Sequence, residues 1–406
     1  MKLSYFIARR LAFNAGHSFS RLIIRVAVTA VALSVAVMII AGAIVNGFQK
    51  EISEKVFGFW GHVTIRSLEQ GSSYGEVPVS KQQLFYPSLE KIAGVRHIQV
   101  FATKAGILKT GKEMEGMVLR GIGADFDWTF LKNYLVEGNI LTAGDTSSKN
   151  KILISKTTSN RLQLHTGDEV IVYFVQQPMR YRKLTIAGIY KTGLEEYDKL
   201  YAIVDLALIQ RINNWDSSQV GGFEVFLNDV RQLDEMGELI NTEYAGQYLE
   251  AKTMKQVNPN LFDWLSLQSM NEKVIILLML LVAIINMTTV LLILILERTN
   301  MVGILKALGG TNWMIRKIFL YQAAYITITG LVIGNLSGIG LCLAQKYFQV
   351  IKLPEESYYV SVAPVWIDLW YILAINAGTL IVCILTLVIP SYLVSQITPV
   401  KAIRFN

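Results

Sequence analysis

Cysteine and histidine are both scarce in this chain of 406 residues. Its two cysteines, Cys342 and Cys383, fall inside long apolar runs, where a thiol serves as a small apolar side chain. The polar part of the chain therefore has no cysteine with which to build a disulfide framework. The four histidines are scattered and show no metal-ligand spacing: His17, His62, His97 and His165. We expect neither a disulfide-rich secreted domain nor a metal enzyme.

A complete nucleotide-binding loop is missing as well. Gly106, Gly111 and Lys112 fit the first seven positions of G-x-x-x-x-G-K-[ST], but Glu113 stands where a hydroxyl would bind Mg²⁺. This stretch also reads as a hairpin rather than as a strand followed by a helix. The densest acidic cluster, Glu195–Asp198, is typical of a solvated turn. The sequence predicts a non-catalytic chain with no metal or cofactor of its own.

Long apolar runs are abundant, and 52% of the residues are hydrophobic. The four runs are Leu22 to Gly47, Val274 to Leu296, Phe319 to Ala344 and Leu369 to Val394. Each reaches the roughly 20 residues that a helix needs to cross a bilayer. A signal peptide cut near Ala41–Ala43 is the alternative for the first run, but that run is too long and begins too late. We predict a membrane protein with four transmembrane helices and a large domain between the first and second spans.

The charge distribution predicts the orientation of these spans. The chain has five basic residues and no acid up to Arg25, and the connection 297–317 has four basic residues and one acid. By contrast, residues 49–273 contain 25 basic and 27 acidic residues. Basic residues are retained on the cytoplasmic side. We therefore place both termini and the 297–317 connection in the cytoplasm, and read the net charge of +7 as a sign of topology rather than of nucleic-acid binding.

These patterns give a full set of predicted boundaries. They are a cytoplasmic amphipathic lead-in at 1–21, spans at 22–48, 269–296, 318–345 and 367–394, an extracytoplasmic domain at 49–268, a cytoplasmic connection at 297–317, an extracytoplasmic loop at 346–366 and a cytoplasmic tail at 395–406. The large domain reads as α+β. We expect a helix at Lys81–Ile92, a hairpin formed by residues 97–109 and 114–120, and a second lobe inserted at about 136–220.

The connection between the second and third spans carries the clearest functional signal. Met301, Ile304, Leu305 and Leu308 form one apolar helical face, and Gly309 follows it. Such a face suits the groove of a partner protein. It also suits the lipid surface, where nearby Trp313, Arg316 and Lys317 could anchor it. The pattern alone leaves both readings open.

Several strings together resemble the permease subunits of the MacB/FtsX-like ABC transporters, and within them the lipoprotein-releasing permeases LolC and LolE. These strings, in chain order, are VNGFQKEI, GHVTI, ISKTTSNRLQLHTGDEV, GLEEYD, GILKALGGT, YYVSVAPV and TPVKAIRF. The resemblance covers essentially the whole chain. It implies a mechanotransmitting subunit of the inner membrane, with a MacB-like core in the periplasm, that releases lipoproteins. An FtsX-like signalling permease that controls envelope hydrolases and a MacB-like exporter of a small molecule or peptide are the alternatives.

The resemblance also implies partners and sites. ATP and Mg²⁺ would be bound by a separate LolD-like ATPase in two copies, docked on Met301, Ile304, Leu305, Lys306, Leu308 and Gly309. A second permease copy or paralogue would complete a cavity for the lipoprotein, lined by Val37, Ile44, Phe48, Met270, Val274 and Leu278. A periplasmic carrier would contact the loop Gln176, Gln177, Pro178, Met179 and Arg180, although this loop is much shorter than the hook that recruits the carrier in LolC. We expect Gly330, Gly334 and Gly338 to pack helices closely, within the chain or in a dimer.

Overall fold

The computed structural model describes residues 19–69, 76–111, 113–142 and 148–392. Its contacts divide the chain into two compact units, and each is described by itself. The membrane unit holds the N-terminal part up to Gln49, Leu265–Lys352 and the part from Val362 onward; the outer unit holds Lys50–Trp264 and Leu353–Ser361. The tail 395–406 and all but the last three residues of the predicted lead-in lie outside the described residues.

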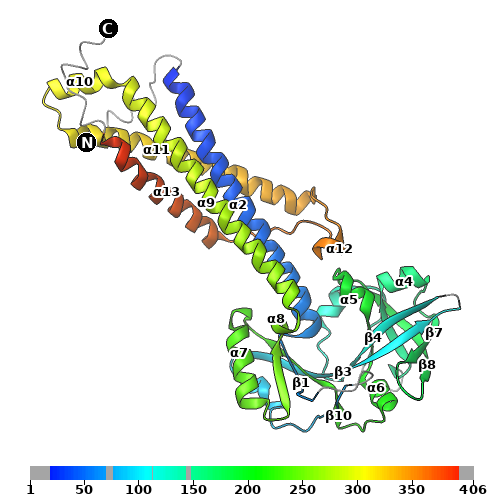
Figure 1. Cartoon of the computed structure of the whole chain (residues 1–406). Helices are drawn as coiled ribbons and strands as arrows, with labels where there is room; N and C mark the ends of the chain where they lie inside the picture. Colours follow the sequence, from blue (N-terminus) through cyan, green and yellow to red (C-terminus); the bar gives the residue numbers. More distant parts are fainter. Residues whose placement is uncertain (1–18, 70–75, 112, 143–147, 393–406) are drawn as a thin grey trace. The chain divides into compact units, whose positions relative to one another are not determined.

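Among the described residues, four helices are long and apolar enough to cross a membrane. They are α2 (Phe19–Trp60), α9 (Pro259–Glu297), α11 (Asn312–Phe348) and α13 (Leu369–Ser391), and a short helix, α10 (Thr299–Ala307), joins α9 to α11. Figure 1 colours them from blue for α2 to red for α13. The helices α2 and α9 extend beyond the predicted spans because their polar outer ends stay helical. Through its last residues α2 becomes part of the outer unit.

A buried apolar cluster connects the helices of the membrane unit, with contributions from Val35 of α2, Met287 of α9 and Phe319 of α11. Three glycines let α11 approach α2 closely. A Cβ added at Gly330 would lie 2.8 Å from Val31 Cβ, one at Gly334 2.7 Å from Ala32 O, and one at Gly338 3.1 Å from Ala36 Cα. Small residues at such a crossing allow backbone contact, which stabilises helix pairs in lipid.

Two asparagines join α11 to α13. The Asn335 side-chain amide donates to Asn376 Oδ1 over 2.7 Å, and Asn376 donates back to Asn335 Oδ1 over 2.9 Å. Each amide also donates to a carbonyl one turn earlier in its own helix. The polar groups of both side chains are thereby satisfied without water, as the interior of a bilayer requires.

A ten-stranded sheet forms the centre of the described part of the outer unit. In chain order its strands are β1 (Val63–Ser67), β3 (Val95–Lys109), β4 (Met114–Ile122), β5 (Leu135–Gly138), β6 (Lys151–Ser155), β7 (Glu169–Phe174), β8 (Arg180–Tyr190), β9 (Tyr201–Asp205), β11 (Gly222–Leu227) and β12 (Leu249–Thr253). The spatial order is β12-β1-β11-β3-β4-β9-β6-β8-β5, and β7 pairs with β3 and β8. The pairs β4·β9 and β6·β8 are parallel. A separate small sheet joins β2 (Val79–Ser80) to β10 (Gln219–Val220).

Short helices connect these strands (Figure 1). They are η1 (Ser88–Lys91), α3 (Thr129–Asn133), α4 (Lys156–Leu162), α5 (Glu195–Leu200), α6 (Leu206–Asn213), η3 (Val230–Gln232), α7 (Leu233–Leu239) and η4 (Ile240–Tyr244), and α8 (Met254–Val257) follows the last strand. One more short helix, α12 (Glu355–Tyr358), lies between α11 and α13 in the chain. Apart from α12, the strands and short helices of the outer unit lie between α2 and α9 in chain order. The predicted second lobe, 136–220, supplies β5 to β10, while the contacts keep 50–264 in one unit; the division into two lobes stays a prediction.

The predicted helix at Lys81–Ile92 is wrong. That segment consists of turns followed by the single 3₁₀ turn η1. Pro87 explains the difference, because proline lacks an N–H donor and disfavours helical geometry in the residue before it.

A fully buried ion pair lies in the interior of the outer unit, between Arg120 and Glu224, whose nitrogen and oxygen are 2.5 Å apart. The Arg120 guanidinium also lies over the rings of Phe59, Trp60 and Phe126 at 4.8–5.3 Å. Phe59 and Trp60 are the last residues of α2. The end of this helix is therefore fixed to the sheet by aromatic and cationic contacts.

Candidate functional site

Most of the segment predicted to dock the ATPase, Met301 to Gly309, forms the helix α10. It ends where the Leu308 N–H donates to Ile304 O over 3.0 Å, and Gly309 follows with φ of +90°, a left-handed conformation that favours glycine. Thr311 then caps α11 by accepting a hydrogen bond from the Met314 N–H. The sequence GILKALGGT thus contains the end of α10, a tight turn and the residue that caps α11.

The apolar face of α10 has two sides in the structure. Met301 and Leu305 are half-buried and pack against the apolar cluster of the membrane unit. Ile304 and Leu308 are 54% and 80% exposed. Lys306 is half-buried, and burial lowers the pKa of its amine. Of the four predicted apolar anchors, only Ile304 and Leu308 are free to contact another molecule.

The exposure of the predicted cavity residues also differs, here between the helices α2 and α9. Val37, Ile44 and Phe48 of α2 are half-buried. The three residues of α9 are exposed: Met270 by 62%, Val274 by 49% and Leu278 by 51%. The exposed face of α9 continues through Leu267, Leu277, Leu281 and Ile285. It is an apolar stripe at helical spacing.

Polar contacts that sequence reasoning missed lie beside this stripe. Buried Glu272 of α9 accepts a hydrogen bond from the Tyr371 hydroxyl of α13, and the Tyr371 ring occupies the space where a side chain at Gly42 of α2 would lie. Gln49 of α2 donates to the Ser269 hydroxyl of α9. The one available signal was an acid, Glu272, two residues before an apolar run. Polar groups at such a place are costly unless they are paired.

The predicted carrier loop is a tight connection between β7 and β8. Arg180 donates from Nη1 to Ile212 O and Asn214 Oδ1, both over 2.9 Å, and Gln176 Nε2 lies 3.5 Å from Ile212 O. These two side chains satisfy carbonyls at the end of α6 rather than face solvent. Gln177, Pro178 and Met179 remain exposed. Only these three of the five predicted residues are free to meet a carrier.

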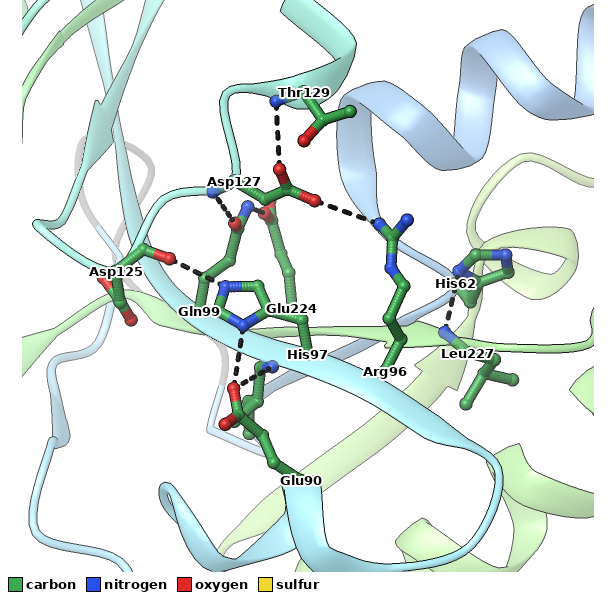
Figure 2. A network of polar contacts seen from close by, with 11 residues as sticks. His62, Glu90, Arg96, His97, Gln99, Asp125, Asp127, Thr129, Glu224 and Leu227 are labelled. Carbon is green, nitrogen blue, oxygen red and sulfur yellow. Dashed lines mark hydrogen bonds and ion pairs between the residues drawn. The ribbon is translucent and has the colours of Figure 1, made fainter.

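A polar network in the outer unit holds the start of β3 to the loop before α3 (Figure 2). His97 lies between two oxygen atoms, with Nδ1 2.7 Å from Glu90 Oε1 and Nε2 2.7 Å from Asp125 O. Arg96 pairs with Asp127 over 3.1 Å. The Asp125 carboxylate accepts from the Val100 N–H and from the Tyr86 hydroxyl, and it raises the pKa of Tyr86 in addition to the effect of burial. Every charged group named here has a partner, so the network reads as structural.

His62 lies at the edge of this network, directly after α2. Burial, with Arg96 nearby, lowers the pKa of His62 to about 4. The neutral ring accepts the Leu227 N–H at Nδ1 over 3.1 Å and stacks on Phe57 at 4.6 Å between centroids. A cavity of about 270 Å³ adjoins it, lined also by Phe130 and Phe226. Among the residues that the structure describes, no group of histidine, cysteine or acidic side chains could hold a metal ion.

The acidic cluster Glu195–Asp198, together with Lys191–Leu194 before it, forms a segment that we call the acidic turn, and it differs from the solvated surface that the sequence suggested. Asp198 is 1% exposed and accepts hydrogen bonds from the Thr192 N–H, the Thr192 hydroxyl and the Gly193 N–H. Burial raises the pKa of Asp198, while these hydrogen bonds oppose the rise. The buried carboxylate closes the turn, because it satisfies donors that no strand or helix pairs.

Comparison with known proteins agrees with this architecture. The model of the MacB-like periplasmic core domain matches residues 26–243, and that of the FtsX-like permease C-terminal region matches residues 273–399. The chain belongs to the MacB/FtsX-like family of ABC transporter permeases, and it is a multi-pass membrane protein.

Relatives match most or all of its length. The lipoprotein-releasing system transmembrane protein LolC of Xylella fastidiosa is 23% identical over 98% of this chain and 97% of that protein. LolC of Haemophilus influenzae is 21% identical over 100% and 99%, and LolE of the same organism 20% identical over 87% and 88%.

Two solved structures match about half of this chain. The periplasmic region of MacB from Actinobacillus actinomycetemcomitans matches 49% of this chain and 91% of its own, with 15% identity and a TM-score of 0.34. The extracellular domain of YknZ from Gram-positive bacteria matches 47% and 98%, with 17% identity and a TM-score of 0.33.

Proposed function

We propose that this chain is the membrane subunit of an ABC transporter that releases lipoproteins from the outer leaflet of the inner membrane. The observation that carries this proposal is the similarity to LolC over 98% of the chain, which includes the domain, the spans and their connections. A separate ATPase, present in two copies, would supply the ATP hydrolysis. Its contact would be the exposed pair Ile304 and Leu308 of α10.

The exposed stripe of α9 suits an acylated substrate. Burying each CH₂ group of an acyl chain contributes about 0.8 kcal/mol, so an apolar face holds such a ligand without a polar site. The half-buried Val37, Ile44 and Phe48 of α2 would form the other wall, with a second permease copy or paralogue closing the cavity. Movement of the spans would then expel the lipoprotein toward a periplasmic carrier.

A photocrosslinking amino acid at Val274 tests the proposal in cells. We expect it to capture many different acylated proteins, because contacts to acyl chains do not select the protein part. The adduct should decrease when ATP-driven turnover is allowed. The matched control is Leu373, an exposed apolar residue of α13, where capture of lipid alone is expected.

Two results would contradict this function. Capture of phospholipid alone at Val274, as at Leu373, would exclude the α9 stripe as a lipoprotein site. Capture of one envelope hydrolase through the outer domain would instead support an FtsX-like signalling role.

A further inference from the structure

The segment Leu353–Ser361 between α11 and α13 belongs by its contacts to the outer unit. Lys352 and Val362 at its ends form a β-bridge, and the Leu353 N–H donates to Ser361 O over 2.9 Å. The two ends of the segment are therefore held side by side, and the segment forms a closed loop. We call Leu353–Ser361 the strap.

The strap contacts the acidic turn, Lys191–Asp198. Lys191 Nζ is 2.9 Å from Glu355 Oε1, and the Tyr359 hydroxyl is 3.5 Å from Glu196 Oε1. Burial and the Glu196 carboxylate both raise the pKa of Tyr359. The Tyr359 hydroxyl is the donor in this hydrogen bond, and the Glu196 carboxylate accepts it. The strings GLEEYD and YYVSVAPV, far apart in the sequence, thus meet in one contact.

A buried lysine of α2 joins the same contact. Lys55 is 7% exposed, and its Nζ lies 3.5 Å from Tyr359 O and 3.6 Å from Glu51 Oε1. A Cβ at Gly193 would lie 3.1 Å from the same Nζ. One ammonium group therefore contacts both Glu51 of α2 and the strap, and it lies next to Gly193 of the acidic turn. Hydrogen bonds from a charged donor are stronger than neutral ones.

Tyr359 has an unfavourable backbone conformation. Its φ is +59°, in the left-handed region that bulky side chains rarely adopt. The ring packs edge-on against Trp264 with centroids 6.2 Å apart, and the N–H donates to Glu355 O. Such a conformation persists only where surrounding contacts impose it, and it is frequent in segments that switch. The contacts of Tyr359 with the outer domain supply that constraint.

The strap is nevertheless weakly held. The side chains of the Lys191–Glu355 pair are 46% and 26% exposed, and exposed pairs contribute little to stability. The helix α12 has four residues, too few to be stable by itself. We propose that the strap is a releasable latch, which is closed on the acidic turn in this structure and opens during the working cycle of the permease. The cycle itself rests on the proposed function.

A water-soluble carbodiimide tests the closed state in the full-length chain in membranes. It adds to the Glu355 carboxylate to give an O-acylisourea, and the Lys191 amine attacks this ester to form an amide while a urea leaves. Mass spectrometry detects the amide as a joined peptide. We expect this link in the wild-type chain. Lys191→Arg is the matched control, because it keeps the charge but cannot form the amide. Absence of the link in the wild type would overturn the latch.

Hydrogen exchange tests whether the latch opens. We expect the strap amides to exchange at least about tenfold faster than those of β3 in the same chain, since local opening requires only the strap to detach. The carbodiimide link should slow them. Strap amides that exchange as slowly as those of β3 would overturn a releasable latch.

Lipoprotein release from spheroplasts connects the latch to function. The linked wild-type chain should release lipoproteins more slowly than the Lys191→Arg chain treated in the same way. Equal rates despite the link would show that opening is not needed for the cycle. If the untreated wild type releases no lipoprotein, the proposed function fails, while linking and exchange still decide whether the latch exists.

Discussion

The buried imidazole of His62 couples the stability of the outer domain to pH. In the folded chain the pKa of His62 is about 4, whereas the unfolded value is 6.5. Between these values the unfolded chain binds a proton that the folded chain excludes. This contribution to stability is therefore complete above pH 6.5 and is lost as the pH falls toward 4. A shift of this size corresponds to roughly 3 kcal/mol.

We predict that His62→Gln reduces this pH dependence. Glutamine can still accept the Leu227 N–H but takes up no proton, so the free energy of unfolding should fall less between pH 6.5 and pH 4 than in the wild type. Thermal unfolding of the detergent-solubilised chain across this range measures the difference. His165→Gln, at an exposed side chain, is the control. Parallel profiles for His62→Gln and the wild type would refute the prediction.

The type of a polar side chain did not predict its role in the fold. Glu195–Asp198 looked like a solvated acidic turn, but Asp198 is buried, because unpaired N–H groups of Thr192 and Gly193 need an acceptor. Arg180 looked available to a carrier, yet it satisfies the end of α6. Neither role follows from local sequence, since the partners are set by chain segments that meet only in the fold.

At the scale of secondary structure, α10 is the element whose surface is easiest to test. We predict that Ile304→Glu with Leu308→Glu abolishes copurification of the ATPase, because a charge buried without a partner in its groove costs several kcal/mol. Ile304→Val with Leu308→Met should retain the ATPase. Recovery of the ATPase with the glutamate pair would favour a helix that lies on the lipid surface.

The exposed part of this apolar face is smaller than the sequence pattern indicated. The sequence pattern placed Leu305 on the same face as Leu308, but Leu305 packs against the membrane unit. Helical spacing identified the apolar face correctly. It does not show which residues of that face pack against neighbouring helices and which stay exposed. The hairpin of β3 and β4, which depends on local alternation, was predicted closely. The elements α5, β9 and α6 were not, because the short apolar stretch there does not distinguish strand from helix.

For the whole molecule, orientation is the central prediction. In a chain with Cys342 and Cys383 replaced by alanine, we predict that an impermeant maleimide labels Leu84→Cys in intact spheroplasts and labels Thr311→Cys only after lysis. The physical reason is the excess of basic residues in the 297–317 connection. Labelling of Thr311→Cys before lysis would reverse the topology.

The order of the apolar helices and of the polar domain along the chain was the most predictable feature of this protein. Four apolar runs with a long polar stretch after the first follow from hydropathy alone, because lipid excludes unpaired backbone groups and so selects long helices. The strand order of the outer sheet did not follow. Parallel pairs such as β4 with β9 join segments about 80 residues apart, and their pairing depends on the shape of the assembled core.

The reciprocal amides of Asn335 and Asn376 give the third and fourth spans a common register. Sliding one helix along the other would break both hydrogen bonds at once, and a bilayer offers no water to replace them. A shifted position of one helix relative to the other is therefore unfavourable. We expect α11 and α13 to move in the membrane as one rigid unit and not to slide past each other.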